Sequence, residues 1–439
     1  MTISKRHLLQ RAGALAGGLS LSAFSRAFAA AQADDWAVPV EVQKAMFNRA
    51  TALVKQKIRG GPNDPVYKKP FVDAAFSGSI FLWDTCFIAT YAKYDQKNLP
   101  IAAALDNFYA MQDSDGFICR EYTAQGQPFW QKDHPVSINP PLLGFAELEL
   151  YSKSGDKERL RQVYPALKAF HDFIVGRYME GDDLFISDGL ASGMDNIPRY
   201  PDGWQDDGQG IKMINLHPEI FVYDGLSPHW NRQGRSVDMS AQMALFTDNL
   251  RTIARLIGEK TDVPRYEDLF GRIASAINRL CWNEEDGFYY DLGYGKQIRR
   301  RHIGMFWVLL AGVVPKARLA PMLGHLTDPK QFWRRFPVAS TPADDPNFAP
   351  NGGYWLGSAW APTNYMIIRG LERYGQHKLA RKLARQYYWC VAQVFKATGT
   401  FWENYAPDAL VPGNPARSDF CGWTALVPIA IYHEYIQVV

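Results

Sequence analysis

Apolar residues along most of the chain recur at every third or fourth position, which is the spacing of an amphipathic α-helix. Ile253, Leu256 and Ile257 illustrate it. Few windows alternate with a period of two, the pattern of a half-buried strand. The pattern predicts roughly twelve helices, at Val40–Ile58, Asp84–Tyr94, Leu99–Gln112, Pro141–Ser154, Glu158–Tyr178, Val237–Ile257, Arg265–Trp282, His302–Ala311, Lys316–Leu326, Ser358–Tyr374, Gln376–Phe395 and Gly422–Ile436.

Several of these helices follow one another after short connections, which favour antiparallel helical hairpins. Six such hairpins closed into a ring form an (α/α)6 toroid. In that all-α fold, loops at one end of the inner helices build a central pocket. Three connections are far longer than usual and rich in Trp, Tyr, Asp, Gly and Pro: Asp115–Asn139, Asp182–Asp238 and Phe332–Leu356. Long loops in compact enzymes usually serve function, so we expect them to bind substrate.

Residues 1–30 have the composition of an export signal. The pair Lys5-Arg6 precedes an apolar run from Ala12 to Phe24, and Ala27-Phe28-Ala29 provides a cleavage site. The pair and the weakly apolar run are similar to a twin-arginine signal, with a general secretory signal as the alternative. Residues 31–439 contain no linker or low-complexity tract, so we predict a single periplasmic catalytic domain.

The charge balance excludes two classes of partner. The chain has 48 Lys and Arg against 45 Asp and Glu, and four of the basic residues lie in the first 29, so the exported part is close to neutral. Neither nucleic acid nor a membrane surface is therefore an expected partner. No second apolar run is long enough to span a bilayer, which predicts a soluble mature protein with no membrane contact after signal cleavage.

Cysteine and histidine spacing gives no metal or cofactor motif. The five cysteines show no C-x-x-C spacing: Cys86, Cys119, Cys281, Cys390 and Cys421. The periplasm permits disulfides, but the odd count and the apolar neighbours of Cys281, Cys390 and Cys421 favour buried free thiols. No His-x-x-x-His pair, phosphate-binding loop or G-x-S-x-G turn occurs. We therefore predict neither a metal nor a cofactor.

Two carboxylates stand in loop-like, non-helical surroundings. Asp195 lies in a Ser-Gly turn closed by Pro198, and Glu403 lies among aromatic residues some two hundred positions later. A lone Asp in such a turn is most often a helix cap or an Asx-turn residue. However, 13 Trp, 22 Tyr and 25 Phe, many in loops, suit the binding of sugar rings. Two acids in that setting suggest paired-carboxylate chemistry.

Five motifs occur in one order along nearly the whole mature chain: FLWDTCF from Phe81, ASGMDNIPRY from Ala191, WNEEDGFYYD from Trp282, GYWLGSAWAPTNY from Gly353, and FWENY from Phe401. In these motifs the chain resembles glycoside hydrolase family 63, which includes processing α-glucosidases and bacterial mannosylglycerate and glucosylglycerate hydrolases, with trehalases more distant. The resemblance implies an inverting, exo-acting α-glycosidase on an (α/α)6 barrel without a metal in the catalytic step.

The resemblance also implies residue roles. The general acid falls on Asp195 and the general base on Glu403. The residues expected to bind the sugar are Trp83, Asp84, Gly193, Arg199, Tyr354, Trp355, Gly357 and Trp360. An ordinary structural interpretation also exists for several of them: Asp84 is placed as a helix N-cap would be, and the aromatic residues suit core packing. We expect Asn404 and Tyr405 to support Glu403 in its ionised form.

The expected substrate is an α-linked glucoside or related hexoside of a periplasmic oligosaccharide or small glycoside. Trehalose is disfavoured, because the arginines that precede the Trp-Asp pair in trehalases are missing. The alternative function is a sugar isomerase or epimerase on the same fold, for which His134 and His302 are the one weak pair of bases. A binding protein would not need both acids, and a polysaccharide lyase would need a uronate groove that the sequence does not specify.

Overall fold

In this computed structural model, each of the twelve windows predicted from the sequence contains helix. The protein is mostly helical, as the sequence indicates. The structure describes residues 36–74, 77–132, 135–138, 140–186, 192–199, 234–293, 295–420 and 422–437. The predicted export signal at 1–30 and most of the predicted loop 182–238 lie outside these ranges. Residues from Val38 onward group as one compact unit.

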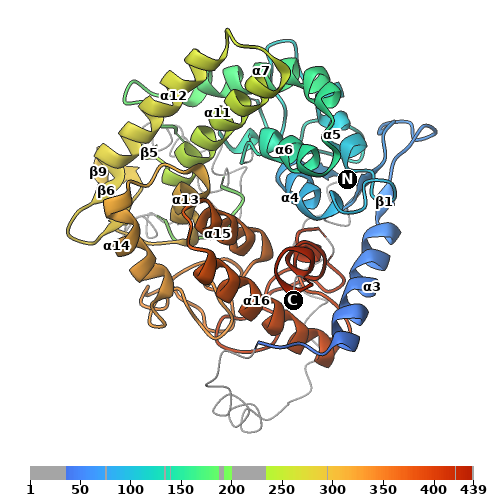
Figure 1. Ribbon diagram of the computed structural model, residues 1–439, viewed down its shortest axis with the longest axis vertical. Helices are drawn as coiled ribbons and strands as arrows, with labels where there is room; N and C mark the ends of the chain where they lie inside the picture. The colour runs from blue at the N-terminus through green and yellow to red at the C-terminus, as the bar shows by residue number, and fades with distance from the viewer. Residues whose placement is uncertain are drawn as a thin grey trace. The chain divides into compact units, whose positions relative to one another are not determined.

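Six helical segments form the interior of that unit: α4 (Leu82–Ala92), α6 (Leu143–Ser154), α11 (Val237–Ile257), α13 (Trp307–Ala311), α15 (Ala361–Arg373) and the pair η5 (Thr424–Leu426) and η6 (Val427–Ile436). Each contacts the next in this order, and η5 returns to contact α4, so the six contacts form a closed cycle (Figure 1). All eleven residues of α4 are buried, and its sequence accordingly lacks a polar face, with Asp84 as its one charged residue.

Six other helices alternate with these in sequence, the first of them preceding α4: α3 (Val40–Gln56), α5 (Ile101–Ala110), α7 (Lys157–Tyr178), α12 (Val263–Ala276), α14 (Lys316–Thr327) and α16 (His377–Thr398). In Figure 1 they lie outside the inner six. They are amphipathic: α12 buries only Tyr266, Leu269, Ile273 and Ala276, and its other side chains are at least partly exposed. Inner and outer helices therefore alternate along the chain.

Very short strands, which the sequence pattern did not indicate, pair the loops: β1 (Ile58–Arg59) with β2 (Phe71–Val72), β3 (Ile80–Phe81) with β4 (Glu121–Tyr122), β6 (Trp282–Asn283) with β7 (Phe288–Tyr289), and β8 (Leu292–Gly293) with both β5 (Gly234–Arg235) and β9 (Lys296–Gln297), all antiparallel. In the β3–β4 pair Phe81 lies opposite Glu121. Because α4 begins at Leu82, this pair holds the loop after α5 against the N-terminal end of α4.

Three predicted helices are not uniform. The window 265–282 contains α12, which ends at Ala276, followed by a five-residue π-helix, η3 (Ile277–Cys281). The short 3₁₀ segments η1 (Pro135–Ser137) and η4 (Ile303–Phe306) complete the described helical structure, with η4 leading into α13. In the last window, η6 is a π-helix that follows the 3₁₀ turn η5. A period of three to four residues does not distinguish α from π geometry, which accounts for the difference.

Four of the five cysteines, Cys86, Cys119, Cys281 and Cys390, are buried free thiols as predicted, and Cys421 lies outside the described residues. Each helix in the described part of the chain is too short or too polar to cross a membrane.

Candidate active site

Four predicted site residues are associated with the N-terminal ends of inner helices. Asp84 lies in the first turn of α4, Tyr354 precedes α15 and Glu403 precedes η5. Asp195 is joined to this end of the ring through Arg199, which pairs with Asp238 in the first turn of α11. The rings of Trp83 in α4 and Trp360 at the N-cap of α15 both pack against Trp423 at the N-cap of η5, so these three helix ends lie together.

Glu403 is buried, with 7% of its surface exposed. Its Oε1 accepts a hydrogen bond of 3.1 Å from the Tyr354 hydroxyl, and its Oε2 accepts one of 3.3 Å from the Arg417 backbone N–H. Burial raises the pKa of Glu403, the Arg417 charge and the Tyr354 hydrogen bond oppose that rise, and the charge of Asp195 adds to it. The folded protein therefore holds the pKa of the Glu403 carboxyl above its usual value.

We expected Asn404 and Tyr405 to support the Glu403 carboxylate, but its hydrogen-bond donors are the Tyr354 hydroxyl and the Arg417 N–H. The Asn404 amide instead donates to the Pro415 carbonyl, and the Tyr405 hydroxyl accepts from the Trp402 N–H. No local signal in the sequence points to Arg417, because it follows Glu403 by fourteen residues. It acts on Glu403 through its charge and through a backbone N–H, which nearly every residue type carries.

Asp195 interacts electrostatically with both Glu403 and Tyr354. Burial raises the pKa of the Tyr354 phenol well above its usual value, and the charges of both Glu403 and Asp195 contribute to the rise. Asp195 is itself half-buried, and Met194 before it is fully buried. Gly193, immediately before Met194, has φ of 74°, a conformation that favours glycine. The structure therefore brings the two predicted catalytic carboxylates into one site.

Asp84 is a third acid beside them and is buried, with 7% exposure. Burial raises its pKa well above the usual value, the charge of Glu403 adds to the rise, and Arg120 opposes it. The N-cap of α4 is Phe81, and no side chain caps the helix. The N-cap interpretation of Asp84 is therefore wrong: the residue is at the third helical position, where the helix dipole favours an anion.

The aromatic residues of the motifs pack against one another. Trp355 and Trp360 stack with ring centroids 4.0 Å apart and planes inclined by 2°, and Trp83 meets Trp355 edge-on at 6.5 Å. Each of these three indoles is at most 2% exposed. Trp423, which the sequence did not single out, joins them edge-on to Trp83 at 6.2 Å and donates through its indole N–H to the Glu403 carbonyl. The cluster forms a packed wall that holds the backbone of Glu403.

Arg199 lies in a buried network. It donates to both Oδ atoms of Asp238 at 2.9 Å and to Asp291 Oδ2 at 3.1 Å, and His302 lies 3.4 Å from its Nη2. Burial opposes ionisation of Asp291, yet Arg199 and His302 hold the pKa of that carboxyl below its usual value. These contacts fix Arg199, and with it the end of the loop that carries Asp195. Contact of Arg199 with a sugar stays a prediction.

Gly357 is surrounded by the loop that precedes α15. A Cβ there would lie 2.7 Å from the Ala349 carbonyl oxygen and 3.0 Å from the Phe348 ring. The residue thus permits close backbone packing. Binding of the sugar stays a prediction for the remaining members of the set as well, namely Gly357, Gly193, Trp83, Asp84, Tyr354, Trp355 and Trp360.

The pair of bases that the isomerase alternative needs, His134 and His302, is not seen among the described residues. His302 is fully buried and contacts Asp291 at 3.3 Å, and His134 lies outside the described residues. Within the same described ranges, no group of three His, Cys, Asp or Glu side chains is arranged to hold a metal ion.

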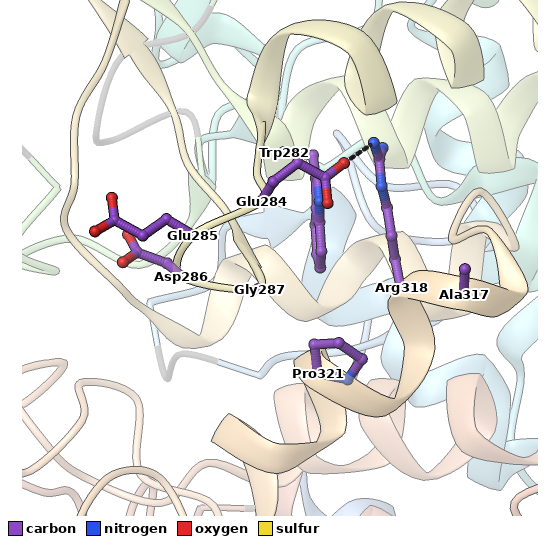
Figure 2. Close-up of a pocket in the computed structure, with 8 residues that line it drawn as sticks. All are labelled: Trp282, Glu284, Glu285, Asp286, Gly287, Ala317, Arg318 and Pro321. Carbon is purple, nitrogen blue, oxygen red and sulfur yellow. Dashed lines mark hydrogen bonds and ion pairs between the residues drawn. The ribbon is translucent and has the colours of Figure 1, made fainter.

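A groove lies at the start of α14, and neither Asp195, Glu403 nor Asp84 lines it. Figure 2 shows Arg318 of α14 beside the Trp282 ring, 4.9 Å from its centroid, and ion-paired with Glu284. Its lining residues are Trp282, Glu284, Glu285, Asp286, Gly287, Ala317, Arg318 and Pro321. None of the residues predicted to bind sugar lines this groove, so it supplies a place for control substitutions.

The chain matches one family model and is similar in sequence to several known proteins. Residues 79–424 match the model described as a mannosylglycerate hydrolase MGH1-like glycoside hydrolase domain. The chain is 25% identical over 341 residues to a mannosylglycerate hydrolase of Rubrobacter radiotolerans, covering 68% of this chain and 74% of the relative. It is 28% identical over 264 residues to a probable mannosyl-oligosaccharide glucosidase of Schizosaccharomyces pombe, covering 56% of this chain but only 29% of the yeast protein.

Among solved structures, a GH63 mannosylglycerate hydrolase of Thermus thermophilus in complex with glucose superimposes with a TM-score of 0.69. The two chains are 21% identical, and the match covers 89% of this chain and all of that one. At this identity the likeness concerns the fold.

Proposed function

Because the chain belongs to the MGH1-like glycoside hydrolase domain family, within the family 63-like glycoside hydrolases, we propose that it is an exo-acting, inverting α-glycosidase. The observation that carries the proposal is the interaction of Asp195 with Glu403 beside Tyr354. The closed cycle of inner helices supports an (α/α)6 toroid as the scaffold.

In the proposed reaction Asp195 gives its proton to the glycosidic oxygen as the bond from that oxygen to the anomeric carbon breaks. Glu403 takes a proton from a water molecule, whose oxygen forms the new bond to the anomeric carbon from the opposite face. The sugar leaves with inverted configuration, and the two carboxyl groups end with their protonation exchanged. Inversion requires a separation of roughly 6.5–9.5 Å between the carboxyl groups to accommodate that water.

The proposed substrate is an α-linked glucoside or related hexoside, either in an oligosaccharide or in a small glycoside. The names of the relatives, a mannosyl-oligosaccharide glucosidase and mannosylglycerate hydrolases, support this range, as does glucose in the Thermus structure. Asp84 supplies a polar group for sugar hydroxyls beside the two acids. The proposed location is the periplasm, based on the export signal in residues 1–30.

The test is proton NMR of the purified protein with a panel of α-linked glucosides, mannosides and galactosides, reading the anomeric signals in the first minutes. We expect the β-anomer of one sugar to appear first. Asp195→Asn and Glu403→Gln should each lower turnover at least about 100-fold, because each removes one proton transfer and little volume.

Glu284→Gln is the matched control, because it makes the same change in the groove of Figure 2 and should leave turnover unaltered. First appearance of an α-anomer would refute inversion. Near-normal turnover in either acid variant would refute that residue's role, and conversion of a free aldose without hydrolysis would favour the isomerase.

A further inference from the structure

Asn196, next to Asp195, connects the loop of the proposed acid to the loop before α15. Its amide N–H donates to the Gly353 carbonyl at 3.0 Å, and its amide oxygen accepts from the Trp355 N–H at 2.8 Å. One side chain thus satisfies a donor and an acceptor on the two neighbours of Tyr354. Asn196 is more than 150 positions away from both partners in sequence.

The loop that Asn196 holds has an unusual backbone. Gly352 has φ of 112°, Gly353 of 53° and Tyr354 of 66°. A left-handed conformation is uncommon for a residue with a bulky side chain and persists only where its surroundings enforce it. Hydrogen bonds to both neighbours of Tyr354 are such an enforcement, and the Trp360 indole N–H adds a third at the Tyr354 carbonyl, at 3.3 Å.

Tyr354 in turn holds Glu403 through its hydroxyl. A continuous set of contacts therefore runs from Asp195 through the adjacent Asn196 to the backbone around Tyr354, and from the Tyr354 hydroxyl to Glu403. Each link is a hydrogen bond or a covalent neighbour. The placement of the acid relative to the base depends on this set, because the two residues come from distant parts of the chain.

We propose that Asn196 is a positioning residue that sets the separation of Asp195 from Glu403 by fastening both loops at Tyr354. This inference rests on the proposed function. Only a carboxamide of this length presents one donor and one acceptor side by side to a peptide backbone; an aspartate lacks the donor, and a glutamine places the same groups one methylene further away. In its absence the acid loop and the Tyr354 loop would move independently.

The test compares two substrates of the same sugar in wild type and Asn196→Ala. An α-glycosyl fluoride needs little help from a general acid, because fluoride leaves readily, whereas an unactivated alkyl α-glycoside needs a correctly placed proton. We expect kcat on the alkyl glycoside to fall about 100-fold, as small misplacement of a reacting group can cause. The kcat on the fluoride should fall about threefold at most, with KM nearly unchanged on both.

Asn196→Gln restores the amide at a different length and should recover part of the lost activity on the alkyl glycoside. If the alanine variant does not fold, the same two rates are compared between wild type and Asn196→Gln. The matched control is Asn278→Ala in η3, which removes an amide that likewise joins backbone groups, the carbonyls of Ala274 and Val313, at 2.8 and 2.7 Å. The control should leave the ratio of the two rates unaltered.

An equal loss on both substrates, or no loss on either, would overturn the role of Asn196. Failure of the proposed function is distinguishable from this result in wild type alone, which would then either hydrolyse neither the fluoride nor the alkyl glycoside of any sugar in the panel or release the α-anomer first.

Discussion

The Tyr354 hydroxyl donates its hydrogen bond to Oε1 of Glu403, although the sequence motif had suggested Tyr354 as a sugar-binding residue. The contact stabilises the ionised form of Glu403, whose pKa burial raises. A residue expected to meet substrate thus acts on the proposed base. The pH dependence of the reaction should report this interaction.

Tyr354→Phe should shift the acidic limb of the kcat profile to higher pH. The variant removes a hydrogen bond that lowers the pKa of Glu403, so a larger fraction of the base is protonated, and inactive, at any given pH. A hydrogen bond to a charged group contributes about 1.5–3 kcal/mol, which corresponds to a shift of about one to two pH units. The measurement is kcat against pH for both proteins.

Tyr109→Phe is the matched control, because the Tyr109 hydroxyl also donates to a buried carboxylate, Glu147, at 2.9 Å, but between α5 and α6. Its profile should coincide with that of wild type. An unshifted acidic limb in the Tyr354 variant would show that another group determines that limb.

Asp84→Asn should raise thermal stability at alkaline pH. The pKa of Asp84 is raised by burial, so the folded state holds its proton more tightly than the unfolded chain does, and stability falls as the pH rises from the unfolded pKa toward the folded one. Asparagine stays neutral and avoids this loss. Calorimetry should show a Tm higher than wild type by about 2 °C at about pH 8 and little difference at about pH 4.

Asp262→Asn, in contrast, should lower thermal stability at alkaline pH. The hydrogen bond from Tyr164 lowers the pKa of Asp262, so its ionised form contributes stability above the unfolded pKa. The loss of Tm should be larger at about pH 8 than at about pH 3. A fall of Tm for Asp84→Asn at alkaline pH would mean that its carboxylate is stabilised as an ion in the folded protein.

Arg199→Met should destabilise the fold strongly. It would leave Asp238 and Asp291 buried without their shared cation, and breaking one partner of a buried ion pair typically costs about 3–5 kcal/mol. Urea unfolding measures the change. Arg299→Met removes a surface partner of Asp286 and should leave the unfolding midpoint almost in place. Equal midpoints for the two variants would show that the buried network adds no stability.

Local sequence pattern was sufficient for most of the fold. The bounds of α11 agree with the predicted window, because its helical period is uninterrupted from Val237 to Ile257. The start of α4 was placed two residues late, since Asp84 resembles a cap in sequence but takes part in the first turn. Strands of two residues carry too little pattern to be recognised.

The site was predictable only at its motifs. Asp195 and Glu403 were selected from their neighbours and the family resemblance, and the structure brings their charges together. The role of Asn196 was not accessible, because its partners are backbone groups of Gly353 and Trp355 in a distant loop. Nor could the sequence reveal that Arg199 pairs with two buried carboxylates, which approach it only in the folded chain.

Closure of the inner ring has a consequence during protein synthesis. The contact between α4 and η5 joins segments roughly 340 residues apart. At about 5–20 residues per second, α4 leaves the ribosome about 20 to 70 s before its last neighbour is made. For that time α4, all of whose residues are buried in the folded protein, lacks part of the surface that covers it, and its apolar side chains are exposed to aggregation.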